Sequence, residues 1–163
     1  MKKLVILCVE DEGEVREAIL RDLALFKPIV RVETADQVDE AKEVLAECAA
    51  DREPVGLVLC DHLMPGTSGV DFLIELQQNA AYAATRKVLI TGQAGLEDTV
   101  RAVNEARLHH YIAKPWQAAD LQGVVRDQLT EYVLAAVDDP TPYIGLLDGP
   151  RLLQHIAATG RDR

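Results

Sequence analysis

The sequence predicts an α/β fold in which a five-stranded parallel sheet lies between two layers of helices, as in a doubly wound three-layer sandwich. Apolar runs typical of strands alternate five times with segments whose apolar residues recur at helical spacing. The strand-like runs are apolar at consecutive positions, which is typical of strands that are buried on both faces. Right-handed crossovers would bring the C-terminal ends of all the strands to one edge of the sheet.

The first half of the chain holds three of the strands and two helices. Residues 4–9 are a continuous apolar run, and residues 29–33 and 55–60 give the second and third strands. Between these strands, helical spacing of apolar residues predicts helices over residues 12–26 and 38–48. The residues that mark the two helices are Val15, Ala18, Ile19, Leu23, Phe26, Val38, Ala41, Leu45 and Cys48.

The second half continues the alternation with a helix over residues 67–79, a strand over 87–90, a helix over 96–103 and a strand over 109–113. A last helix over residues 117–137 would be ~30 Å long, which is more than packing on the sheet requires. Its apolar stripe therefore extends beyond the sheet. The stripe consists of Leu121, Val125, Gln128, Leu129, Tyr132, Val133 and Ala136.

Residues 1–137 are expected to form one domain, and residues 138–163 a C-terminal extension or linker without an output domain. The acidic and proline-rich stretch over 138–142 ends the last helix. An exposed apolar stripe needs a covering surface, so we expect a homodimer across a two-fold axis through this helix. The leucines that follow Tyr143 could instead fold back onto the stripe or pack across the dimer, and a disordered linker is the third alternative.

The composition is that of a globular protein, with 163 residues of which 48% are hydrophobic and 27% charged. A net charge of -10 disfavours direct binding to nucleic acid and to anionic membrane surfaces. No apolar run approaches the ~20 residues that a membrane-spanning helix needs. The three cysteines lie in apolar segments, which indicates a reducing, cytoplasmic compartment and no disulfide framework.

Polar residues stand where four of the five predicted strands end. They are Glu10, Asp11, Asp61, Thr91 and Lys114. Each acid alone could be a helix cap, but carboxylates crowded at one sheet edge repel one another unless they share a cation. Oxygen ligands without Cys or His indicate Mg²⁺. Carboxylates beside a lysine and a hydroxyl are suited to receive a phosphoryl group, because these groups offset the charge on its oxygens.

Four short motifs occur at these strand ends in a specific order and spacing. They are Val9-Glu10-Asp11-Glu12, Leu59-Cys60-Asp61-His62-Leu63-Met64-Pro65, Leu89-Ile90-Thr91-Gly92 and Tyr111-Ile112-Ala113-Lys114-Pro115. Over roughly residues 3–135, the sequence resembles the receiver domain of two-component response regulators, of the type seen in the chemotaxis response regulator. The resemblance implies the flavodoxin-like receiver fold, with sheet order 2-1-3-4-5.

The resemblance also implies an acceptor and a metal site. Asp61 would be the phosphoacceptor. Asp11 and Asp61 would bind Mg²⁺ directly with the backbone carbonyl of Leu63, and Glu10 would hold the metal through water. Glu10 stands where many members of the family have Asp, and its longer side chain should still reach a metal-bound water. Leu63 and Gln93 would line the rim of the site and tune hydrolysis of the phosphoryl group.

The remaining motif residues would form the switch. Lys114 would pair first with the acceptor carboxylate and then with a phosphoryl oxygen, and Thr91 would bond another phosphoryl oxygen. Tyr111 would be the aromatic residue that rotates on phosphorylation. The bond between Lys114 and Pro115 would be cis, which directs the lysine toward the site. We interpret His62, beside the acceptor, as a residue that fills the pocket rim.

The function implied is a signalling phosphoacceptor, which assists only its own phosphorylation and dephosphorylation and is not an enzyme for another substrate. Its partners would be a sensor histidine kinase and a downstream effector or output domain. A receiver fold that binds partners without phosphorylation remains an alternative. A second alternative, less supported by the motifs, is a phosphatase of the haloacid dehalogenase type. Such phosphatases need a second acid two residues after the nucleophile, where this chain has Leu63, and their nucleophile follows the first strand.

Overall fold

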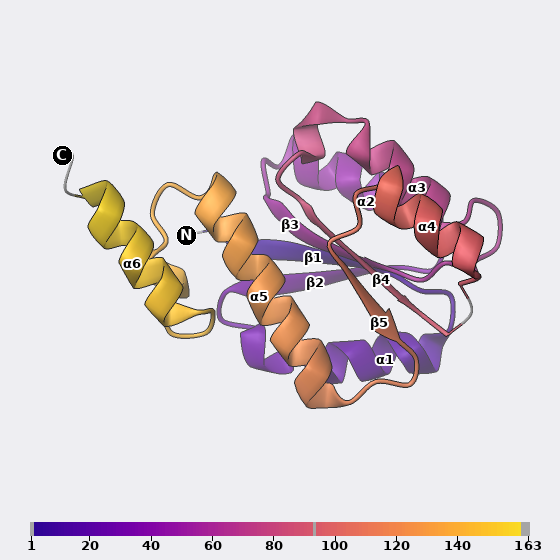
Figure 1. The fold of residues 1–163 in the computed structure, drawn as a ribbon, viewed down its shortest axis with the longest axis horizontal. Coiled ribbons are helices and arrows are strands. Elements are labelled where there is room, and N and C mark those ends of the chain that lie inside the picture. The colour runs from indigo at the N-terminus through magenta and orange to yellow at the C-terminus, as the bar shows by residue number, and fades with distance from the viewer. Residues whose placement is uncertain (1, 93, 161–163) are drawn as a thin grey trace.

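The computed structural model describes residues 2–92 and 94–160 and shows a parallel sheet between two layers of helices (Figure 1). The strands are β1 Leu4–Val9, β2 Val30–Ala35, β3 Val55–Cys60, β4 Arg86–Thr91 and β5 His110–Ala113. Their order in the sheet is β2-β1-β3-β4-β5, and every neighbouring pair is parallel. The predicted fold class and strand order are confirmed.

The helices divide between the two faces of the sheet. They are α1 Gly13–Asp22, α2 Val38–Ala50, α3 Gly69–Gln77, α4 Leu96–Asn104, α5 Ala118–Ala136 and α6 Gly149–Gly160, with short 3₁₀ turns at Ala24–Phe26, Ala80–Tyr82 and Thr141–Tyr143. In Figure 1, α1 and α5 lie on one face of the sheet, and α2, α3 and α4 lie on the other. None of the helices in these described parts of the chain has both the length and the apolar character needed to cross a bilayer.

The core has two halves, one on each face of the sheet. Leu4 and Ile6 of β1 belong to the buried cluster that includes α1 and α5 residues. Val5 and Leu7 belong to the cluster that includes α2 and α3 residues. Alternate side chains of a strand point to opposite faces, so a strand covered on both sides is apolar at every position. This explains the continuous apolar runs in the sequence.

The end of α5 is covered by the chain's own C-terminal segment. Tyr132 and Val133 of α5 lie in one buried cluster with Tyr143, Leu147 and Leu152. In Figure 1, α6 lies beside α5 and away from the sheet. The C-terminal segment therefore folds back onto the apolar stripe of α5.

Two polar contacts fix this arrangement. The N–H of Asp148 donates to the Thr130 hydroxyl at 3.1 Å, and Nε of Arg126 donates to the Leu146 carbonyl at 3.1 Å. The prediction that part of the stripe is exposed is therefore wrong from Leu121 to Val133, where its residues are buried within one chain, whereas Ala136 at the end of the stripe is exposed. The homodimer stays a prediction, but an exposed apolar stripe on α5 no longer supports it.

Candidate functional site

Carboxylates from two strand ends and an ammonium from a third meet at the C-terminal edge of the sheet. Glu10 and Asp11 follow β1, Asp61 follows β3 and Lys114 follows β5. The three acids each offer a carboxylate oxygen, and these atoms all lie within 4.8 Å of one another. Nζ of Lys114 lies 2.7 Å from Glu10 Oε2 and 2.9 Å from Asp61 Oδ2. The lysine therefore bridges two of the acids.

The charges in this acidic pocket act on one another. Burial opposes ionisation of Asp61, but hydrogen bonds from Thr91, Lys114 and the His62 N–H outweigh it and hold its pKa below the ordinary value. Burial raises the pKa of Glu10, and the Asp61 charge adds to this effect against the opposing bond from Lys114. Burial alone would lower the pKa of Lys114, but the two carboxylates raise it. Asp61 is therefore held as a carboxylate beside an ammonium.

The loop after β1 is held by an arginine of the first helix. Nη1 of Arg16 donates to the backbone carbonyls of Glu10 at 2.8 Å and Asp11 at 3.2 Å. The N–H of Glu12 donates to Glu10 Oε1 at 3.2 Å. These bonds fix the backbone that carries the two acids. Arg16 was not among the site residues predicted from the sequence, because its bonds to these carbonyls depend on how the loop after β1 folds.

The loop after β3 passes very close to the start of α3. The N–H of Gly69 donates to the His62 carbonyl at 3.0 Å. A Cβ at position 69 would lie 1.7 Å from the Asp61 carbonyl oxygen, so a residue without a side chain is required there. Ser68 caps α3 by accepting a bond from the Asp71 N–H at 3.2 Å. Together these contacts set the position of the Asp61 backbone.

The switch residues predicted from the sequence lie next to the pocket. The Tyr111 hydroxyl donates to the Thr91 carbonyl at 3.2 Å, and the Lys114–Pro115 bond is cis. Leu63 is 49% exposed, as a rim residue would be. Gln93 lies outside the described residues. The structure thus brings the predicted acids, the lysine and the threonine together, with the predicted switch tyrosine beside the threonine.

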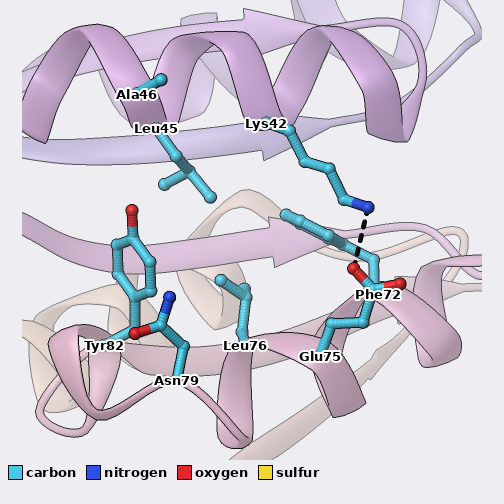
Figure 2. Close-up of a pocket in the computed structure, with 8 residues that line it drawn as sticks. All are labelled: Lys42, Leu45, Ala46, Phe72, Glu75, Leu76, Asn79 and Tyr82. Carbon is cyan, nitrogen blue, oxygen red and sulfur yellow. Dashed lines mark ion pairs between the residues drawn. The ribbon is translucent and has the colours of Figure 1, made fainter.

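A hollow away from this site lies between α2 and α3 (Figure 2). Its lining is largely apolar and includes Leu45, Phe72 and Tyr82. An ion pair between Lys42 Nζ and Glu75 Oε2, 2.8 Å apart, lies at one side of it. Its lining combines apolar side chains with one ion pair, whereas the strand ends bring together three acids, a lysine and a threonine, so the strand-end site is the stronger candidate for a functional site.

Comparisons with known proteins agree on the kind of domain. Residues 6–126 match the family model described as the response regulator receiver domain. The chain is 36% identical over 125 residues to the hydrogenase transcriptional regulatory protein HoxA of Cupriavidus necator, a match that covers 77% of this chain and 24% of that protein. It is 30% identical over 129 residues to the response regulator protein PilR of Pseudomonas aeruginosa, covering 79% of this chain and 27% of that protein. The chain thus spans about a quarter of these two relatives.

Solved structures give the same result for the fold. The CheY-like response regulator receiver domain protein from Methanospirillum hungatei JF-1 superposes with a TM-score of 0.67 at 27% identity. That match covers 80% of this chain and 96% of the other. The part of this chain that superposes therefore corresponds to nearly the whole of a separate domain.

Proposed function

Since the chain belongs to the response regulator receiver domain family, we propose that Asp61 accepts a phosphoryl group from a sensor histidine kinase. The observation that carries the proposal is the setting of the Asp61 carboxylate. Asp61 as a residue is 4% exposed, and its carboxylate lies 2.9 Å from Lys114 Nζ and is also hydrogen-bonded by Thr91. Its lowered pKa keeps it ionised, which a carboxylate nucleophile requires.

The proposed transfer is a single displacement at phosphorus. An Asp61 oxygen forms a bond to phosphorus while the bond from phosphorus to the kinase's histidine nitrogen breaks, and that nitrogen keeps the electron pair. Lys114 and Thr91 stand where they can bind the phosphoryl oxygens, and positioning with charge stabilisation supplies most of the catalysis in such transfers. The chain assists only its own phosphorylation and dephosphorylation.

The acidic pocket also fits a magnesium ion, because its donors are carboxylate oxygens that lie close together. In the proposed site, Asp11 and Asp61 hold Mg²⁺ with the backbone carbonyl of Leu63, and Glu10 holds it through water. When bound, the ion offsets negative charge on the phosphoryl oxygens. Asp11 is exposed and Glu10 fully buried, so the Asp11 side of this group of acids faces solvent.

The proposed output is a change of the surface formed by α4, β5 and α5, read by a downstream effector or output domain. This surface already carries exposed apolar side chains on α4, at Leu96, Val100 and Val103.

The cysteines of the chain are free and buried, which supports a cytoplasmic location. A receiver that binds its partner equally well in both states is the remaining alternative.

Phosphorylation with a small donor tests the proposal. With acetyl phosphate and Mg²⁺, intact-mass measurement should show one phosphoryl adduct on the whole chain, and no adduct should form when a chelator removes the metal before the donor is added. Asp61→Asn should show none, and Asp39→Asn, an exposed acid at the start of α2, should behave like the wild type. An adduct that persists in Asp61→Asn would refute the assignment.

A further inference from the structure

We propose that His62 couples the phosphoacceptor to helix α4 through Asp98, as a route separate from that of Thr91 and Tyr111. The inference rests on the proposed function, because it assumes that Asp61 is phosphorylated. It gives a positioning role to His62, which from its sequence alone was expected only to fill the pocket rim.

His62 is hydrogen-bonded both to the phosphoacceptor Asp61 and to Asp98 of α4. Its backbone N–H donates to Asp61 Oδ1 at 2.7 Å. Its ring Nε2 lies 3.0 Å from Asp98 Oδ2, and its side chain is 8% exposed. A carboxylate only accepts, so Nε2 carries the proton of this bond. Within the part of the chain that the structure describes, the buried Nδ1 has no hydrogen-bond partner, so the bond to Asp98 orients the ring.

Helix α4 is the element in which one polar bond should matter most. Leu96 is 83% exposed, Val100 47% and Val103 53%. Among the residues of α4, Ala102 is the one that is buried. Burial of apolar area therefore contributes little to holding this helix in place. The polar contacts of α4 must therefore supply a larger share of the free energy that holds it against the domain.

Asp98 joins His62 to a second contact of the same helix. Arg101 Nη1 lies 3.6 Å from Asp98 Oδ1, and Arg101 Nη2 donates to Asp71 Oδ1 of α3 at 2.7 Å. Asp98 thus connects the loop that carries Asp61 to the pair between α4 and α3. A shift of His62 would reach both contacts.

Phosphorylation changes the first bond in this series. Formation of the acyl phosphate moves the negative charge from the Asp61 carboxylate to the phosphoryl oxygens. The His62 N–H then loses its charged acceptor, and charge-assisted hydrogen bonds are about twice as strong as neutral ones. The weaker bond lets the residue move, and its ring carries that movement to Asp98. The expected result is a looser α4 in the phosphorylated protein.

Hydrogen exchange over residues 96–104 of the whole chain tests the coupling. Without phosphate, His62→Phe keeps a ring but removes the donor, and it should speed exchange of α4 about fivefold, which corresponds to the loss of one typical hydrogen bond. His62→Gln, which keeps an N–H donor, should restore most of the protection. Glu97→Gln changes an exposed acid in the same helical turn and should leave exchange unchanged.

A second measurement, on the phosphorylated protein, distinguishes a His62 that transmits phosphorylation to α4 from one that only packs against it. With acetyl phosphate and Mg²⁺, exchange over 96–104 should rise in the wild type, and His62→Phe should show less than half of that rise at equal phosphoryl yield. Two results would overturn the coupling alone, provided that the wild type forms the adduct. One is a full phosphorylation-dependent rise in α4 exchange in His62→Phe. The other is an exchange rate of unphosphorylated His62→Phe equal to that of the wild type. A wild type that takes up no phosphoryl group would refute the proposed function, and the coupling with it.

Discussion

The Tyr111 hydroxyl donates a hydrogen bond to the Thr91 carbonyl across 3.2 Å, which ties the proposed switch tyrosine of β5 to the proposed phosphoryl-binding threonine of β4. The two residues belong to neighbouring parallel strands. A movement of Thr91 toward a phosphoryl group would therefore act on the tyrosine directly. The bond gives the predicted switch a physical connection in the resting state.

Thr91→Ala should separate phosphorylation from the movement of Tyr111. The variant keeps Asp61 and Lys114 and should still accept a phosphoryl group, but it lacks the hydroxyl that a phosphoryl oxygen would attract. With tyrosine rings labelled for NMR, phosphorylation should shift the Tyr111 signal in the wild type and leave it nearly unchanged in Thr91→Ala. Equal shifts in both proteins would show that Thr91 does not drive the switch.

Gly69→Ala should destabilise the fold strongly. The added Cβ would lie 1.7 Å from the Asp61 carbonyl oxygen, and the backbone must move to relieve the overlap. We expect a loss of about 3 kcal/mol in the free energy of unfolding, measured by urea denaturation. Gly123→Ala is the matched control, because that position in α5 is open and alanine favours a helix by about 0.5–1 kcal/mol. A Gly69→Ala chain as stable as Gly123→Ala would contradict the close approach.

His109 should make stability depend on pH. Burial and the charges of Arg86 and Lys87 lower its pKa from 6.5 to about 4, and its Nδ1 accepts the Lys87 N–H at 2.9 Å. The unfolded chain takes up a proton near pH 6.5 but the folded chain only near pH 4. The stability from this group is therefore present above pH 6.5 and is lost as the pH falls toward 4.

Denaturant unfolding at pH 7 and pH 5 measures this effect. The wild type should lose about 1–2 kcal/mol more than His109→Asn, whose side-chain oxygen can accept the same bond without titrating. His110→Asn, at the exposed neighbouring position, should keep the wild-type dependence. The same pH dependence in His109→Asn and the wild type would refute the assignment.

Leu152→Ala should reveal how tightly the C-terminal segment is held. Leu152 is fully buried in the cluster that covers α5, whereas Leu153 in the same helix is 53% exposed. We expect Leu152→Ala to lower the free energy of unfolding by about 2–3 kcal/mol and Leu153→Ala to change it little. Equal, small effects of both substitutions would mean that α6 does not pack on α5.

The sheet and the acidic pocket could be predicted because both follow from local patterns. β1 and β3 are apolar at every position since both of their faces are covered. The ends of parallel strands meet at one edge, so Asp61 and Lys114 come together although 53 positions separate them. Neither inference needs knowledge of how side chains pack.

Contacts that depend on tertiary packing could not be predicted. Tyr143 and Leu152 form a short apolar segment that could cover α5 in the same chain or in a second one, and the pattern is the same in both cases. The bond between His62 and Asp98 joins positions 36 apart and depends on the orientation of one buried ring. No spacing rule in the sequence points to that pair.

The most direct test of the account is to locate the phosphoryl group. Borohydride reduces an aspartyl phosphate to homoserine, so reduction after treatment with acetyl phosphate and Mg²⁺, followed by peptide mass mapping, identifies the modified residue. The account predicts homoserine at position 61 and an unmodified Asp11. Homoserine at Asp11 or at any other acid, with an unmodified Asp61, would contradict it.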